Sequence, residues 1–332
     1  MAVITTLLNK NKTLYILSLK LGITILAFYF VAHKIDLDQL MMIRIEKMRM
    51  LIIAIYAAIV LVFFQALRWH FVLRALTIYS TFRKDILSVW SGHFLNNILP
   101  TSAAGDFVRS YTLRYRGADQ GRWLGAFFAE KFSAMVTALF LAIISSFMEG
   151  LDGMHAEVKI MVVVVFVFSF IGIFILGLFI RVGNKIISKR ILDFLSKIYF
   201  GIINVFSTSS GWAALVTSFI INMGMCLIFY VTAKAMGVAL YISHCFFVVP
   251  VFSVFASLPI SYAGWGVREL SSIHLFGLLG VGSEQALAMT VLYGVIILLS
   301  SLPGLFSIRA FVAAVRESRA AYGLADKATR VC

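Results

Sequence analysis

Residues 162–180 read VVVVFVFSFIGIFILGLFI, an apolar run interrupted only by Ser169 and two glycines. A helix needs about 17–25 such residues to cross a bilayer core, whereas a strand of a membrane barrel alternates in polarity over about ten residues. The whole chain is 61% hydrophobic and 13% charged, against about 45–50% and about 25% in soluble domains. The sequence therefore predicts an all-α integral membrane protein.

Six apolar runs are long enough to span a membrane. They cover residues 13–32, 50–68, 123–147, 160–180, 211–233 and 285–308. The first run is too long for the apolar region of a typical signal peptide, and no small-x-small cleavage site follows it. We therefore expect it to be the first spanning helix.

Two further apolar regions, residues 86–115 and 243–279, are broken by proline and glycine. Pro100 and Gly105 divide the first, and Pro259 and Gly264 divide the second. Each piece is short for a full span, which favours a re-entrant helical hairpin. The alternative is a kinked helix in a bundle of eight or ten crossings.

The two broken regions share a motif. Residues 99–109, LPTSAAGDFVR, align without a gap on residues 258–268, LPISYAGWGVR, and seven of the eleven positions are identical. The offset of 159 residues also carries span 50–68 close to span 211–233. We therefore expect two repeats, residues 1–155 and 156–332, each with three crossings and one hairpin. An odd number of crossings inverts the second repeat, and paired interrupted segments in inverted repeats point to a transporter's substrate site.

The net charge of +14 lies in short loops, which indicates membrane topology and contact with anionic headgroups rather than nucleic-acid binding. If both hairpins re-enter, most basic loops share one face and the acidic loop near 149–157 lies on the other. The chain is then a multi-pass inner (plasma) membrane protein with both termini in the cytoplasm. Loop 33–49 fits less well because it carries four basic residues. In residues 184–204 the apolar side chains would share one face of a helix and the basic side chains the other, which predicts an amphipathic helix on the cytoplasmic leaflet.

Arg109 and Arg268 occupy the same position in the two motifs. A guanidinium facing the membrane interior is costly unless it is paired or lines an aqueous cavity. Beside the N-terminus of a half-helix it could hold a phosphate through two hydrogen bonds, so we expect both arginines to line one cavity. The alternative is an anchor that reaches the lipid headgroups.

Other polar residues near the motifs complete the candidate site. Glu130 and Lys131 lie about seven residues inside a span, where ionisable groups are usually functional, although a structural ion pair is the alternative. The expected substrate-binding set is Asn97, Ser102, Asp106, Arg109, Glu130, Lys131, Ser261, Trp265, Arg268 and Glu269, and the expected hinges are Pro100, Gly105, Pro259 and Gly264.

Enzymatic motifs are missing from the sequence. It contains no HExxH or CxxC spacing for a metal, no GxSxG elbow, no clustered carboxylates for a pyrophosphate-bound metal and no Walker A lysine. We therefore expect no catalytic residues, no metal, no cofactor and no direct use of ATP.

The strings at 96–109 and 258–269, with Gly280, residues 284–287 (EQAL) and residues 302–304 (LPG), resemble the transmembrane region of lysylphosphatidylglycerol synthases. The family includes stand-alone, flippase-like proteins. In its two-domain members this region is thought to move aminoacylated phospholipid between leaflets, and a soluble C-terminal domain makes that lipid. The chain ends about 24 residues after its last expected span, so we expect no synthase domain.

This resemblance implies a flippase-like transporter of an anionic or aminoacylated phospholipid or of a polyprenyl-phosphate-linked substrate. Two departures concern the substrate: Ala134 follows Glu130-Lys131 where the family often has an Asp, and the first turn, Ala103-Ala104-Gly105, is poorer in glycine. The alternative function is an accessory subunit that presents a lipid or polyprenyl-phosphate to a glycosyltransferase. Self-association and a partner glycosyltransferase or synthase both stay open.

Overall fold

The computed structural model describes residues 45–313, except 100, 114–117, 119, 152–155, 183–187, 258–260 and 263, together with five separate residues before 45. The described residues form helices joined by short turns, and none of them is in a β-strand. Five helices are long and apolar enough to cross a membrane, namely α4 (Met48–Ala75), α7 (Gln120–Ser145), α8 (Ala156–Val182), α10 (Ser209–Ala235) and α13 (Ser283–Ser301).

These helices coincide with five of the six expected spans, and the expected span 13–32 lies outside the continuously described residues. Shorter helices occupy the two broken regions. They are α5 (Phe82–Ile98), α6 (Ala104–Tyr111), α11 (Ile242–Ser257) and α12 (Val267–Gly277).

The order of helices in the first half recurs in the second. α4 to α7 correspond to α10 to α13, each about 160 residues later. The turns match as well: the Ile78 N–H donates to the Leu73 carbonyl after α4, and the Val238 N–H donates to the Ala233 carbonyl after α10. Both turns contain a residue with positive φ, Thr77 at 55° and Gly237 at 72°. In such a turn one residue adopts the left-handed conformation, and the next backbone N–H can then bond one of the last carbonyls of the helix.

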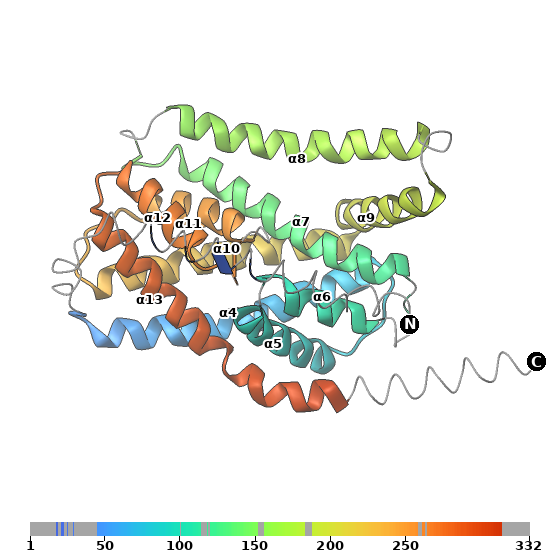
Figure 1. Ribbon diagram of the computed structural model, residues 1–332, viewed down its shortest axis with the longest axis horizontal. Coiled ribbons are helices and arrows are strands. Elements are labelled where there is room, and N and C mark those ends of the chain that lie inside the picture. Colours follow the sequence, from blue (N-terminus) through green and yellow to red (C-terminus); the bar gives the residue numbers. More distant parts are fainter. Residues whose placement is uncertain are drawn as a thin grey trace, which may run out of the picture.

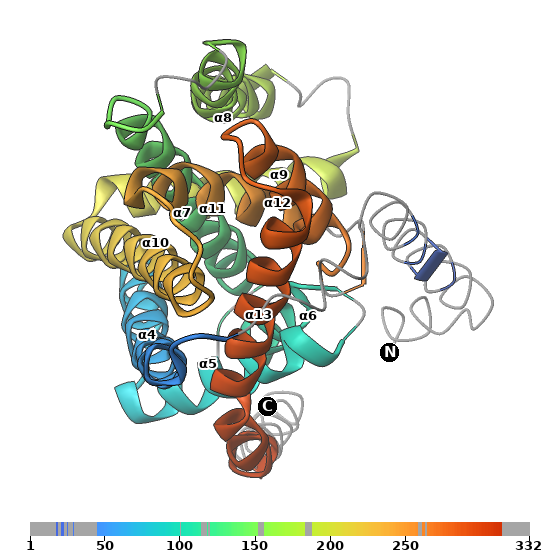
Figure 2. The ribbon, with the colours of Figure 1, turned by 90° about the vertical axis from the view of Figure 1, so that its left-hand side faces the viewer.

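The equivalent helices α4 and α10 lie side by side (Figure 2), and the start of α4 meets the end of α10. The backbone N–H groups of Glu46 and Lys47, just before α4, donate to the carbonyl of Ala235, the last residue of α10. Halfway along, Leu61 lies against Gly224, where a Cβ would come within 2.6 Å of the Leu61 side chain. An antiparallel pair of equivalent helices is the arrangement that an inverted repeat requires.

The tips of the two broken regions meet. The Ser102 hydroxyl, beside the first tip, donates to the Ala256 carbonyl at 3.1 Å, and the Tyr262 hydroxyl, beside the second, donates to the Ile98 carbonyl at 3.0 Å. The expected hinges Pro100 and Pro259 lie outside the described residues. Gly105 is required by packing, because a Cβ there would lie 2.0 Å from the Gly92 carbonyl oxygen. Gly264 has a φ of 82°, which favours glycine.

The remaining helices lie at one side of this arrangement. α8 forms the outer edge, upper in Figure 1, and only Val162 and Gly177 in it are buried. α9 (Lys189–Ser207) overlaps the expected amphipathic helix 184–204, whose residues 184–187 lie outside the described residues. Its buried face packs on α7, where Gly201 lies directly against Gly125. α9 also keeps apolar side chains exposed, among them Ile191 and Phe200.

Candidate functional site

A cavity of about 240 Å³ lies where α4, α5, α6 and α7 meet α10, α11 and α13. One part of its wall is polar and the other is largely apolar. The lining residues are Gln65, Arg68, Asn96, Ser102, Asp106, Arg109, Lys131, Ile221, Asn222, Met225, Cys226, Val249, Pro250, Ser253 and Tyr293. Every charged residue in this wall belongs to the first half of the chain.

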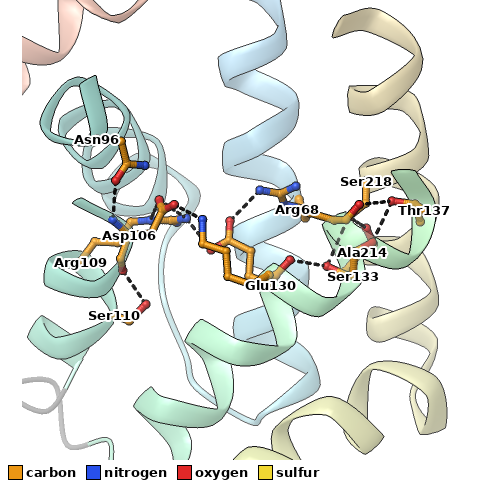
Figure 3. A network of polar contacts seen from close by, with 12 residues as sticks. Arg68, Asn96, Asp106, Arg109, Ser110, Glu130, Ser133, Thr137, Ala214 and Ser218 are labelled. Carbon is orange, nitrogen blue, oxygen red and sulfur yellow. Dashed lines mark hydrogen bonds and ion pairs between the residues drawn. The ribbon is translucent and has the colours of Figure 1, made fainter. Parts of the chain in front are cut away.

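Glu130 lies behind this wall and joins three helices. Its side chain is fully buried. One carboxylate oxygen accepts a hydrogen bond from Arg68 Nη2 of α4 at 2.9 Å, and the other accepts from Arg109 Nη2 of α6 at 2.5 Å. Figure 3 shows Glu130 on α7 between these two guanidinium groups.

Asp106 forms the second anionic centre. It accepts a hydrogen bond from Arg109 Nε at 3.0 Å and pairs with the Lys131 ammonium. Asn96 of α5 holds the start of α6 in place, because its side-chain oxygen accepts from the Gly105 N–H at 2.7 Å and from the Asp106 N–H at 3.3 Å (Figure 3). The side chain thus caps a neighbouring helix, where backbone N–H groups lack partners.

Two guanidinium nitrogens of this cluster, Arg68 Nε and Arg109 Nη1, are buried and have no hydrogen-bond partner among the described residues. Arg109 also stacks on Trp69, with its Cζ 4.2 Å from the ring centre. A buried donor without a partner costs about 1–3 kcal/mol, and more when it is charged. Both nitrogens have almost no accessible surface, so they lie beside the cavity rather than open to it.

The cluster is weak evidence for a purely stabilising role. A buried ion pair roughly breaks even against well-packed apolar residues, because each charge must be removed from water. Charges inside a membrane protein usually mark a substrate or ion path. The combination of three cations, two carboxylates and an adjoining cavity therefore indicates a binding site.

Arg268 has different surroundings from Arg109. Arg268 donates from Nε and Nη2 to the adjacent Glu269 at 2.9 and 2.6 Å and stacks on Trp265 at 4.5 Å. Glu269 also accepts from the Gly266 N–H at 2.7 Å, so this pair caps α12. Arg268 is not among the residues that line the cavity. Of the two arginines, only Arg109 therefore lines this cavity, and a binding role of Arg268 stays a prediction.

The helix packed against each arginine gives the physical reason for this difference. Arg109 faces Glu130 of α7, whereas the α13 residue that lies against the Arg268 guanidinium is Gly294, where a Cβ would come within 2.2 Å of Nη2. Because α13 supplies no carboxylate at this position, Arg268 pairs with its neighbour on α12.

The other sequence-predicted residues divide between the cavity and the hairpin turns. Ser102, Asp106, Arg109 and Lys131 line the cavity, with Glu130 directly behind. The Asn97 amide nitrogen donates to the His93 carbonyl one turn earlier on the same helix. Ser261 is buried near the second tip, and its hydroxyl has no hydrogen-bond partner among the described residues.

The lining residues that the sequence did not predict include Arg68, Asn222, Pro250 and Tyr293. The sequence placed Arg68 in a loop because the apolar run ends there, but α4 continues to Ala75. Pro250 lies inside α11, and a proline within an apolar helix is a signal in the sequence that could have indicated this part of the cavity. No group of three potential metal ligands occurs among the described residues.

Comparison with known proteins identifies the family but no individual relative. No curated protein and no solved structure matches the chain. Residues 17–304 match the family model described as the lysylphosphatidylglycerol synthase transmembrane region. The match covers most of the chain and includes every residue of the cavity. The chain is therefore a multi-pass membrane protein that belongs to the family of lysylphosphatidylglycerol synthase transmembrane regions.

Proposed function

We propose that this protein is a flippase-like transporter that moves a phospholipid or a lipid-linked substrate between the leaflets of the inner membrane. In this proposal six helices cross the membrane, α5–α6 and α11–α12 form re-entrant hairpins, and both termini are cytoplasmic. The repeats 1–155 and 156–332 are inverted copies. The antiparallel packing of α4 and α10 and the family membership support this arrangement.

One observation carries the proposal: a charged, partly apolar cavity lies beside the meeting point of the two hairpin tips. A charged group at the centre of a bilayer costs about 2.5–3.5 kcal/mol on insertion scales. Paired cations and carboxylates in the cavity can replace the water that a headgroup loses. The chain then lowers the barrier to crossing without catalysing a covalent reaction.

The residues divide into two roles in this mechanism. Arg68, Arg109 and Lys131 attract the headgroup, while Asp106 and Glu130 hold the cations in position between contacts. Ser261, Trp265, Arg268 and Glu269 act in the second hairpin, where they fix the turn before α12. Ser102 and Tyr262 join the two tips, so a hydrogen-bond change there would alter access to the cavity.

Reconstitution into liposomes tests this function. The purified protein alone should move labelled phospholipid between leaflets faster than protein-free liposomes do. An accessory subunit for a glycosyltransferase would bind the lipid but leave its distribution unchanged. Failure of transport with several labelled phospholipids and with a polyprenyl-phosphate sugar would refute the proposal.

A further inference from the structure

We propose that the cavity selects lipids whose headgroup carries a single phosphodiester anion and disfavours headgroups of net positive charge, such as a lysyl ester. The inference rests on the proposed function only in that the bound molecule is taken to be a membrane lipid. It separates this protein's substrate from the aminoacylated lipid for which its family is named.

The charge of the site is the first argument. The cluster contains three cations, Arg68, Arg109 and Lys131, and two carboxylates, Asp106 and Glu130, which leaves one net positive charge. One phosphodiester neutralises the site, whereas a lysylphosphatidylglycerol headgroup, with two ammonium groups and one phosphate, adds a second positive charge.

The free hydrogen-bonding capacity is the second argument. The carboxylates already accept bonds from the three cations, whereas Lys131 lines the cavity with its side chain 35% exposed and bonds Asp106 with only one of its three N–H donors. A phosphate has only acceptor oxygens to offer, and charge-assisted bonds to them are strong. A lysyl ammonium offers only donors, and the carboxylates of the site already hold these cations.

The opposite wall is the third argument, because it indicates a lipid rather than a free anion. Ile221, Met225, Val249 and Pro250 come from α10 and α11 and carry no charge. The first half of the chain thus holds the phosphate, and the second half offers an apolar surface to the adjoining chain of the lipid.

Titration of purified protein in neutral detergent tests the inference, with thermal unfolding as the measure of binding. The probes are short-chain phosphatidylglycerol, its lysyl ester, short-chain phosphatidylcholine and glycerol phosphate. Phosphatidylglycerol should bind at least about tenfold more tightly than the lysyl ester, since at least one charge-assisted hydrogen bond is at stake. Glycerol phosphate should bind more weakly than phosphatidylglycerol because it has no chain for the apolar wall.

Variants connect the preference to the cluster. Lys131→Gln removes one cation from the half-exposed edge of the site and should weaken phosphatidylglycerol binding by about tenfold while leaving the lysyl ester less disfavoured. Arg68→Gln should act in the same direction. Lys197→Gln removes the same charge from the surface of α9, outside the cavity, and should leave both affinities unchanged.

Each result decides the matter. Equal or tighter binding of the lysyl ester would overturn the inference, as would absence of binding by all four probes. If glycerol phosphate binds as tightly as phosphatidylglycerol, the site recognises a free phosphate and the inference that its ligand is a lipid fails. If phosphatidylglycerol is preferred but no lipid crosses the membrane of liposomes, the charge selection stands and the proposed transport function fails.

Discussion

Glu130→Gln tests whether the buried cluster is organised by the Glu130 carboxylate. The substitution keeps the size of the side chain but replaces one acceptor oxygen by an N–H donor, which would face a guanidinium. Two bonds are affected, to Arg68 Nη2 at 2.9 Å and to Arg109 Nη2 at 2.5 Å, and the Glu130 side chain is fully buried. Removing one partner of a buried ion pair costs about 3–5 kcal/mol. Gln keeps one acceptor, so we expect a loss of about 3 kcal/mol.

Reversible unfolding in mixed detergent micelles would measure this loss. Glu157→Gln is the matched control: it makes the same chemical change on an exposed part of α8 and should stay within about 0.5 kcal/mol of wild type. A double-mutant cycle with Arg68→Met should give a coupling energy of about 0.5–3 kcal/mol. A Glu130→Gln protein as stable as the control would refute the reasoning, because two buried guanidinium groups cannot lose the carboxylate that they share without a cost in stability.

Three further outcomes are expected. Arg109→Lys should reduce lipid transport by about tenfold or more, since one ammonium cannot bond Asp106 and Glu130 together as the guanidinium does; wild-type transport by a normally folded variant would leave only an anchoring role. Gly105→Ala should prevent folding or shift α6, because its Cβ would lie 2.0 Å from the Gly92 carbonyl oxygen, and wild-type stability would contradict this packing. Asp152→Cys should react with an impermeant thiol reagent in intact cells, and reaction only after permeabilisation would reverse the proposed topology.

The long helices could be predicted from the sequence because each contains an apolar run long enough to cross a bilayer. α4, α7, α8, α10 and α13 were expected within a few residues at most ends. Their ends were less predictable, since a helix continues beyond the apolar run when its polar residues find partners. Arg68 is the clearest case: it lies within α4 because Glu130 of α7 accepts its hydrogen bond.

The site could be predicted only in part, because a motif records the chain near the turn and not the helix packed against it. Arg109 and Arg268 occupy identical motif positions, yet Glu130 of α7 faces Arg109, whereas Gly294 of α13 lies against Arg268. Asn96 and Asn97 pose a similar problem. Adjacent residues point about 100° apart on a helix, and only the rotation of α5 against α6 decides that Asn96 caps α6.

Transport through the cavity is the central claim, and blocking the cavity without changing its charge tests it most directly. Ser253→Trp fills the cavity from α11, whereas Phe255→Trp adds the same side chain at an exposed position of the same helix. We predict that liposomes with Phe255→Trp move labelled phosphatidylglycerol at the wild-type rate and that folded Ser253→Trp protein moves none. Wild-type transport by Ser253→Trp would contradict the account, because the headgroup would then cross the membrane by another route.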